Sequence, residues 1–193
     1  MQTWVLATNN KGKLAELVAL LPDKDLRPQG AFFQAEAEET GLSFIENAII
    51  KARFAADKTG LPAIADDSGI EVNALNGQPG IYSARYAGVG STDLDNLQKL
   101  LAELHDVDDD QRQASYYCAM VYVRHAQDPT PIIGLGRWQG QILRAPQGSG
   151  GFGYDPIFYL ADYQCTAAQL APELKNQISH RAQALAALVA QLV

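Results

Sequence analysis

The sequence has few cysteines and no long apolar run. Only two of its 193 residues are cysteines, Cys118 and Cys165, and neither belongs to a C-x-x-C pair, which excludes a disulfide-rich scaffold and a cysteine-based metal site. No apolar run approaches the roughly 20 residues that cross a membrane, and the run at residues 4–7 is too short for the core of a signal peptide. We therefore expect a cytoplasmic protein with reduced thiols.

Positive charge is also scarce. The chain carries 15 Lys and Arg against 22 Asp and Glu, a formal net charge of −7, so it lacks the basic excess that binding to a nucleic-acid backbone requires. An anionic ligand would have to be held locally. The local basic groups are Lys11 with Lys13, Lys51 with Arg53, and Lys175 with His180 and Arg181.

What the chain does contain is the pattern of an α/β protein. The 47% hydrophobic content, with no internal repeat or separating linker, predicts a single domain over residues 1–193. Apolar runs predict strands at residues 3–8, around 64, 70–75, 115–124, 132–142 and 156–160. Helical spacing predicts helices near residues 14–21, 43–59, 92–105 and 179–192, the second starting with a Ser43–Glu46 capping box. Such alternation favours a mixed sheet flanked by helices.

Two adjacent carboxylates follow one of these strands. Asp66, Asp67 and Ser68 lead into Gly69, and we interpret Ser68-Gly69 as a turn between two strands. Mg²⁺ prefers carboxylate and water oxygens and is commonly shared with substrate phosphates, so the pair is a candidate metal site. A glutamate from the acidic segment 36–39 is a candidate second ligand. The structural alternative is an ordinary surface turn.

Two loops are candidates for binding a nucleotide. Residues 8–13 join a strand to a helix, where unpaired backbone N–H groups attract anions, although the Walker A pattern is absent. Residues 148–153 match G-x-G-x-x-G, but Pro156 and a predicted strand follow instead of a helix, so we reject the dinucleotide interpretation. The rings of Phe152 and Tyr154 are suited to stacking on a base. Ser68 lacks the G-x-S-x-G elbow, so serine-hydrolase chemistry is unsupported.

Six blocks in a fixed order closely resemble the Ham1-type inosine triphosphate pyrophosphatases over nearly the whole chain. They are TNNKGK at 8–13, GLSFIENA at 41–48, ADDSG at 65–69, PGIYSARY at 79–86, GGFGYDP at 150–156 and ISHR at 178–181. One departure is Gln169, where glutamate is expected in many relatives, which puts a local salt bridge in doubt.

The resemblance implies an α/β fold with two closely packed lobes and an active-site cleft between them, Mg²⁺ as cofactor, and a homodimer. It implies hydrolysis of ITP, dITP and XTP to the monophosphate and pyrophosphate, which removes deaminated purines from the nucleotide pool. Asp67 would be the catalytic proton acceptor and a metal ligand, with Glu39, or its neighbour Glu38, as the second ligand. The residues expected to contact the nucleotide are Thr8, Asn9, Asn10, Lys11, Gly12, Lys13, Lys51, Ser68, Phe152, Gly153, Tyr154, Asp155, Lys175, His180 and Arg181.

The expected mechanism is attack of water on the α-phosphorus, which the negative charges of the triphosphate oppose. In this hypothesis Asp67 deprotonates the water, Asp66 supports the metal shell, and Lys13 and Lys51 bind the phosphate chain. Lys51 could instead only pair with nearby carboxylates.

Selection of the base would depend on position 6 of the purine, which carries an oxygen in hypoxanthine and xanthine but an amino group in adenine. Hydrogen-bond donors from Lys175, His180, Arg181 and the glycine-rich loop are the candidates. Two alternatives stay open: an enzyme that acts on pyrimidine nucleotides or removes the terminal phosphate, and a catalytically silent nucleotide-binding sensor. The Asp66-Asp67 pair disfavours the sensor.

Overall fold

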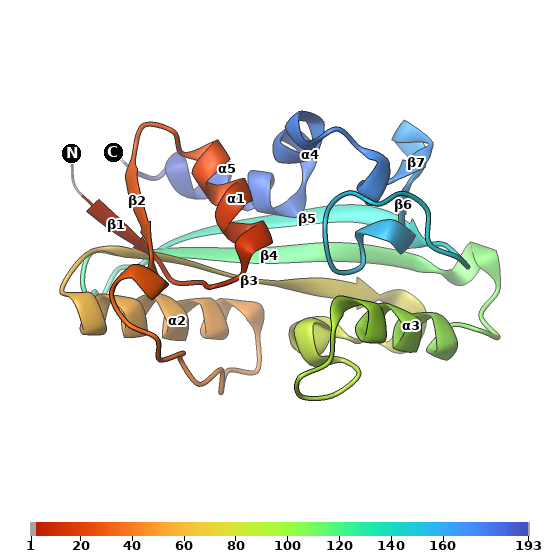
Figure 1. The fold of residues 1–193 in the computed structure, drawn as a ribbon, viewed down its shortest axis with the longest axis horizontal. Helices are drawn as coiled ribbons and strands as arrows, with labels where there is room; N and C mark the ends of the chain where they lie inside the picture. The colour runs from red at the N-terminus through yellow and green to blue at the C-terminus, as the bar shows by residue number, and fades with distance from the viewer. Residues whose placement is uncertain (1–2, 193) are drawn as a thin grey trace. The chain divides into compact units, whose positions relative to one another are not determined.

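The computed structural model describes residues 3–192 and has an α/β fold with a mixed seven-stranded sheet, ordered β2-β1-β3-β4-β5-β6-β7 (Figure 1). The strands are β1 (Thr3–Leu6), β2 (Asp25–Pro28), β3 (Ala63–Val72), β4 (Gln113–Val123), β5 (Ile132–Ile142), β6 (Phe158–Leu160) and β7 (Cys165–Thr166). β1 pairs in parallel with β2 and β3, whereas β6 pairs antiparallel with β5 and β7. The predicted mixed sheet is therefore confirmed.

Within residues 3–192, five α-helices accompany the strands. They are α1 (Lys11–Leu20), α2 (Phe44–Thr59), α3 (Asp93–Glu103), α4 (Pro172–Ile178) and α5 (His180–Val189). α2 starts as the sequence predicted, because the Ser43 side chain caps the backbone N–H of Glu46. Its last residue is Thr59 and its C-cap is Gly60, whose positive φ of 68° suits that position. None of the helices within residues 3–192 combines the length and apolar character that a membrane crossing requires.

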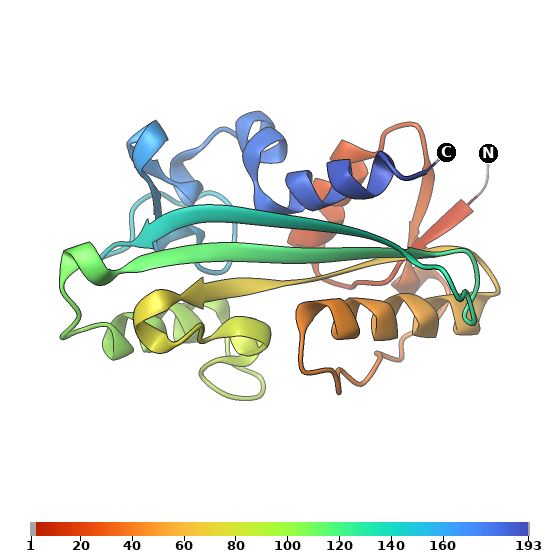
Figure 2. The ribbon, with the colours of Figure 1, turned by 180° about the vertical axis from the view of Figure 1, so that it is seen from behind.

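Two compact units share the chain. The first holds residues 3–67, 118–136 and 180–192, and the second holds residues 68–117 and 137–179. In the first unit α1 and α5 cover one face of the strands and α2 covers the other, as both ribbon views show (Figures 1 and 2). Its core is formed by Trp4, Leu6, Leu17, Leu21, Ile64, Cys118, Met120, Tyr122, Ala184, Leu185 and Leu188.

The second unit has a separate core. The apolar face of α3 contributes Leu97, Leu100 and Leu104, which pack with the aromatic group Tyr116, Trp138 and Phe158. The ring centroids of Tyr116 and Phe158 are 4.6 Å apart. This core therefore fixes the start of β6 and, with it, the end of the glycine-rich loop that precedes it.

Two expectations about elements were wrong. β3 runs unbroken from Ala63 to Val72, so Ser68-Gly69 is not a turn. β1 pairs with this strand only at Ala63 and Ile64, and β4 is its neighbour on the other side; pairing within a sheet overrides local turn preference. The last helix, by contrast, begins at His180 as expected, directly after Ser179, which is extended (φ −66°, ψ 160°) and ends the separate helix α4. Strand 156–160 begins only at Phe158, after a 3-10 turn.

The two cysteines are free thiols, as predicted. Cys118 is fully buried in β4, and burial raises the pKa of its thiol to about 12. A thiol with so high a pKa is not a nucleophile near neutral pH.

Candidate active site

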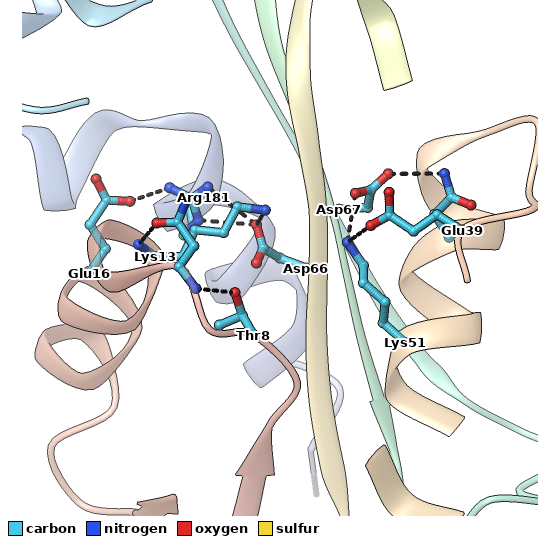
Figure 3. A network of polar contacts seen from close by, with 10 residues as sticks. Thr8, Lys13, Glu16, Glu39, Lys51, Asp66, Asp67 and Arg181 are labelled. Atoms are coloured by element: carbon cyan, nitrogen blue, oxygen red, sulfur yellow. Dashed lines mark hydrogen bonds and ion pairs between the residues drawn. The ribbon is translucent and has the colours of Figure 1, made fainter. Parts of the chain in front are cut away.

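Asp66 and Asp67 project to opposite faces of β3. Successive side chains of a strand alternate between its faces, and Figure 3 shows Asp67 turned toward Lys51 and Glu39 while Asp66 turns toward Lys13 and Arg181. Both aspartates are buried, at 1% and 7% exposed. The two adjacent carboxylates therefore belong to two different polar clusters.

The Asp67 cluster has an ammonium group between two carboxylates. Lys51 Nζ lies 2.7 Å from Asp67 Oδ1 and 2.8 Å from Glu39 Oε1. The Asn47 amide donates to Asp67 Oδ2 at 3.4 Å. Asn47 and Lys51 are four residues apart on α2, so they lie on the same face of that helix. Lys51 thus pairs with carboxylates, as the structural alternative predicted, and the carboxylates are the two expected metal ligands.

The segment before α2 fixes the position of these groups. The backbone N–H of Gly41 donates to Asn47 Oδ1 at 2.9 Å, and that of Leu42 donates to Glu46 Oε2 at 2.9 Å. A Cβ atom at Gly41 would come within 2.6 Å of the Glu46 Cβ, so only glycine allows this close approach. The loop that carries Glu39 is therefore tied to the first turn of α2.

The surroundings raise the pKa of both Asp67 and Lys51. Burial raises the pKa of the Asp67 carboxyl, although the charge of Lys51 opposes that rise. Burial alone would lower the pKa of Lys51, but the carboxylates of Asp67, Asp66 and Glu39 outweigh it and the pKa is raised. A carboxylate with a raised pKa is suited to accept a proton from water.

The Glu39–Asp67 pair fits a magnesium ion that completes its shell elsewhere. No group of three or more His, Cys, Asp or Glu side chains within residues 3–192 is arranged to hold a metal. Mg²⁺, however, is commonly bound through one or two carboxylates, with water and substrate phosphates as the remaining ligands. Glu39 and Asp67 already converge on one cation, the Lys51 ammonium. Their oxygens thus face one position that a cation occupies.

The Asp66 cluster joins two helices of the first unit to β3. Asp66 Oδ2 lies 3.0 Å from Lys13 Nζ and 3.2 Å from Arg181 Nη2, and Arg181 also pairs with Glu16. Burial alone would raise the pKa of Asp66, but the charges of Lys13 and Arg181 outweigh it and hold the pKa well below its ordinary value. Asp66 therefore stays ionised and does not share the Glu39–Asp67 pair.

The N-terminus of α1 lies beside this second cluster. Asn10 is its N-cap, and the Asn10 Oδ1 accepts from the backbone N–H of Lys13 at 3.1 Å. Thr8 Oγ1 accepts from the backbone N–H of Asn10 at 3.2 Å, and the Asn9 amide donates to Glu36 at 3.2 Å. Residues 8–13 thus form the strand-to-helix turn that the sequence predicted, with Lys13 in the first helical turn.

A third polar cluster is found in the second unit, around the glycine-rich loop. Asp155 is buried and lies 2.6 Å from Lys175 Nζ, and it accepts from the backbone N–H of Phe152 at 2.9 Å. Lys175 Nζ lies 4.8 Å from the centroid of the Phe152 ring, within the range of a cation–π contact. Tyr116 donates its hydroxyl to Asp155 at 3.3 Å. The cluster combines an aromatic ring with a buried ion pair.

Contacts from the segment 83–93 hold the rest of this loop. The hydroxyl of Tyr154 donates to the carbonyl of Ser83 at 2.7 Å, and the backbone N–H of Gly153 donates to Asp93 at 2.8 Å. Gly151 has φ +68°, and a Cβ there would come within 2.0 Å of Asp155 Oδ2. A larger residue at this position would therefore displace the Asp155 carboxylate.

Three clusters therefore contain most of the residues that the sequence singled out. Thr8, Asn10, Lys13 and Arg181 belong with Asp66, Glu39 and Lys51 with Asp67, and Phe152 and Lys175 with Asp155. Ser68 lies within β3 and His180 is a buried residue at the start of α5. At Gln169, Oε1 accepts from the Thr166 backbone N–H at 2.9 Å, so the glutamine forms a capping contact instead of a salt bridge.

Two contributors were missed by the sequence analysis. Asn47 bridges Gly41 and Asp67, and its spacing of four residues from Lys51 was the available signal. Glu16 pairs with Arg181 across 165 residues of sequence, and no local pattern indicates such a pair.

Comparison with known proteins identifies the family. The model of the Ham1 family matches residues 4–191. The chain is 59% identical over 187 residues to a dITP/XTP pyrophosphatase of Photorhabdus laumondii, covering 96% of this chain and 95% of that protein. It is 58% identical over 191 residues to a dITP/XTP pyrophosphatase of Escherichia coli K12, covering 98% and 97%.

Solved structures give the same result. The HAM1 protein of Coxiella burnetii aligns with a TM-score of 0.91 at 51% identity, over 100% of this chain and 98% of that one. The Ham1 protein of Staphylococcus aureus aligns with a TM-score of 0.87 at 41% identity, over 99% and 98%. Sequence blocks, family model and fold therefore agree over nearly the full length. This chain belongs to the Ham1 family.

Proposed function

We propose that this chain is a dITP/XTP pyrophosphatase, which hydrolyses dITP, ITP and XTP to the nucleoside monophosphate and pyrophosphate. The observation that carries the proposal is the convergence of the Glu39 and Asp67 carboxylates on one cation, the ammonium group of Lys51 on α2. The names of relatives that are 58–60% identical support the same reaction.

In the proposed mechanism Asp67 orients and deprotonates the attacking water. Its raised pKa makes it a better proton acceptor than an ordinary aspartate, and Asn47 and Lys51 hold the carboxylate in position. The Lys51 side chain would move its ammonium group from the carboxylates to the phosphate chain when the substrate binds. Lys13 and the backbone N–H groups at the start of α1 would bind phosphate oxygens.

Glu39 and Asp67 would hold Mg²⁺. When bound, Mg²⁺ supplies charge neutralisation of the triphosphate and stabilisation of the pyrophosphate leaving group. Without the metal, the two negative charges of Glu39 and Asp67 would be opposed by the single positive charge of Lys51. The site would then repel an anionic substrate.

Recognition of the base is assigned to the cluster of the second unit. The Phe152 ring offers a stacking surface, and Lys175 is a donor held in place by Asp155. A donor fixed by a buried ion pair favours a base with an oxygen at position 6 over adenine, because the amino group of adenine would leave the donor without an acceptor. His180 and Arg181 are further candidate donors from the start of α5.

We infer a homodimer, a cytoplasmic location and a cleft between two lobes from the family resemblance. Light scattering tests the dimer.

A nucleotide panel tests the proposed function. With the purified protein and Mg²⁺, turnover of dITP, ITP and XTP should exceed that of ATP, dGTP and dUTP by orders of magnitude. In H₂¹⁸O the label should enter the monophosphate, since water attacks the α-phosphorus. Release of orthophosphate, or equal rates on ATP and ITP, would contradict the proposal. Preferential turnover of dUTP would favour the pyrimidine alternative, and binding without turnover would favour the sensor.

A further inference from the structure

We propose that Asp66 is a positioning residue that holds Lys13 in its place for binding phosphate, and that it is not a ligand of the metal. This inference rests on the proposed function and deepens it, because it assigns a role to a buried carboxylate that neither the metal site nor the base site uses. Three observations support it.

The first observation is the direction in which the Asp66 side chain leaves β3. Asp66 and Asp67 are consecutive residues of an unbroken strand, so their side chains must leave it on opposite faces. Figure 3 shows the backbone of β3 between the Asp66 carboxylate and the group formed by Asp67, Glu39 and Lys51. A carboxylate on that far face cannot join Glu39 and Asp67 around one small ion.

The second observation is that two cations, Lys13 and Arg181, contact the same carboxylate oxygen. A single oxygen, Asp66 Oδ2, lies 3.0 Å from Lys13 Nζ, 3.3 Å from Arg181 Nε and 3.2 Å from Arg181 Nη2. The Arg181 side chain is 2% exposed and the Lys13 side chain 16%. Two cations in a place with so little water repel one another unless an anion lies between them. Asp66 supplies that anion.

The third observation is the difference between the two cations. Arg181 is held from a second side by Glu16, so it keeps an anionic partner if Asp66 loses its charge. Lys13 has a flexible four-carbon stem, and within residues 3–192 its ammonium group forms an ion pair with Asp66 alone. Loss of the Asp66 charge should therefore release Lys13 toward solvent and leave Arg181 in place. Lys13 stands at the N-terminal turn of α1, where phosphate is expected to bind.

Binding of inorganic pyrophosphate tests this role without relying on turnover. Calorimetric titration would compare wild type, Asp66→Asn, Lys13→Met and the double variant Asp66→Asn/Lys13→Met. Simple electrostatics predicts that Asp66→Asn binds the anion more tightly, because a negative charge has been removed. Positioning predicts weaker binding, by about tenfold, as expected for the loss of one charge-assisted contact.

The double variant shows whether Asp66 acts through Lys13. If it does, Asp66→Asn adds less than about twofold to the loss already caused by Lys13→Met, a strong non-additivity. Additive losses would contradict the proposal, and so would unchanged or tighter binding by the single variant Asp66→Asn. Asp25→Asn is the matched control, because Asp25 also pairs with a cation of the first unit, Arg27, but on β2; it should bind pyrophosphate like the wild type.

Metal dependence separates the two possible roles of Asp66. Positioning predicts that Asp66→Asn leaves the Mg²⁺ concentration for half-maximal thermal stabilisation unchanged, whereas Glu39→Gln raises it. A raised value for Asp66→Asn would overturn the proposal. If Asp66→Asn does not fold, Asp66→Glu keeps the charge and moves the carboxylate by one methylene, and it should bind pyrophosphate more weakly than the wild type. Wild-type-like affinity there would also overturn it.

The outcomes distinguish this inference from the proposed function. A wild type that binds pyrophosphate but does not hydrolyse dITP would refute the function and leave the binding test of Asp66 intact. A variant Asp66→Asn with full pyrophosphate affinity, in a protein that does hydrolyse dITP, would refute the positioning role alone. A wild type that binds no pyrophosphate would overturn the positioning role, since Lys13 would then hold no phosphate.

Discussion

Lys51 Nζ lies 2.7 Å from Asp67 Oδ1, so the nearest cation to the proposed base is a side chain of the protein itself. The same nitrogen lies 2.8 Å from Glu39. Without any metal, the two carboxylates are therefore compensated by the charge of Lys51, which holds them together.

Lys51→Met should make the first unit depend on Mg²⁺ for its stability. Without metal, loss of one member of a mostly buried charge cluster should cost about 2 kcal/mol, or roughly 4–8 °C in Tm for a chain of this size. Millimolar Mg²⁺ should raise the Tm of this variant more than that of the wild type, because the ion binds where the ammonium was. Thermal unfolding with and without Mg²⁺ measures both effects.

Lys58→Met is the control for this experiment. Lys58 lies on the same helix, exposed to solvent and over the ring of Phe54, and its removal should change neither the Tm nor the Mg²⁺ response appreciably. Equal Mg²⁺-induced shifts in wild type and Lys51→Met would show that Lys51 does not compete with the metal.

Asp67→Asn should abolish turnover while the fold survives. The amide is nearly isosteric with the carboxylate but cannot accept the proton of water, so kcat should fall by about 10² to 10⁴, the usual contribution of a general base. Steady-state kinetics at saturating Mg²⁺ and circular dichroism measure the two properties. Asp57→Asn, an exposed aspartate of α2, should retain wild-type kcat, and near-normal kcat in Asp67→Asn would rule out Asp67 as the base.

Elements with complete local signals were predictable from the sequence. α2 has a cap, an apolar stripe and a terminating glycine, and the structure places its start and end where these signals do. β3 could not be predicted in full, because Ser68-Gly69 is a turn-forming pair and its extended form depends on the strand's place in the sheet beside β4. α4 has seven residues, too few to show a helical period. Boundaries set by tertiary neighbours are thus the ones that local patterns miss.

The candidate site, like the fold, could be predicted only in part. The sequence blocks pointed to Asp67, Lys13 and Arg181, but the contact between Arg181 and Asp66 joins positions 115 residues apart. Asp66 and Asp67 contact different residues because they are neighbours in one strand, where successive side chains point to opposite faces. A turn at Ser68-Gly69 would leave both carboxylates at one end of a strand, whereas the unbroken strand places them on opposite faces.

Gly151→Ala should disrupt the glycine-rich loop more than Gly153→Ala does. Both glycines have positive φ, 68° and 61°, so both substitutions carry the strain of about 1 kcal/mol or more that a left-handed residue imposes. Only at Gly151 would the added Cβ clash, 2.0 Å from Asp155 Oδ2, whereas nothing lies within 4 Å at Gly153. Urea unfolding should therefore show a larger loss for Gly151→Ala, and equal losses would contradict the clash.

The turn between β4 and β5 should make stability depend on pH through Asp128. This carboxylate is 1% exposed and accepts from the backbone N–H groups of Arg124 and Thr130 at 2.9 and 3.0 Å. The hydrogen bond from the Arg124 side chain, before all other causes, holds the pKa of Asp128 well below its ordinary value. Because the folded state prefers the ionised form, the stabilisation is present above the unfolded pKa of about 3.9 and is lost as pH falls toward the folded pKa.

Asp128→Asn should therefore lower stability most at neutral pH. The amide keeps one acceptor oxygen but loses the charge, so the free energy of unfolding should fall by about 2 kcal/mol at pH 7, the usual scale for hydrogen bonds to a charged group. The difference from the wild type should shrink below about pH 4. Urea unfolding of both proteins at pH 7 and at the lowest pH where both fold measures this difference, and a gap that is constant or widens in acid would show that the charge of Asp128 does not stabilise the turn.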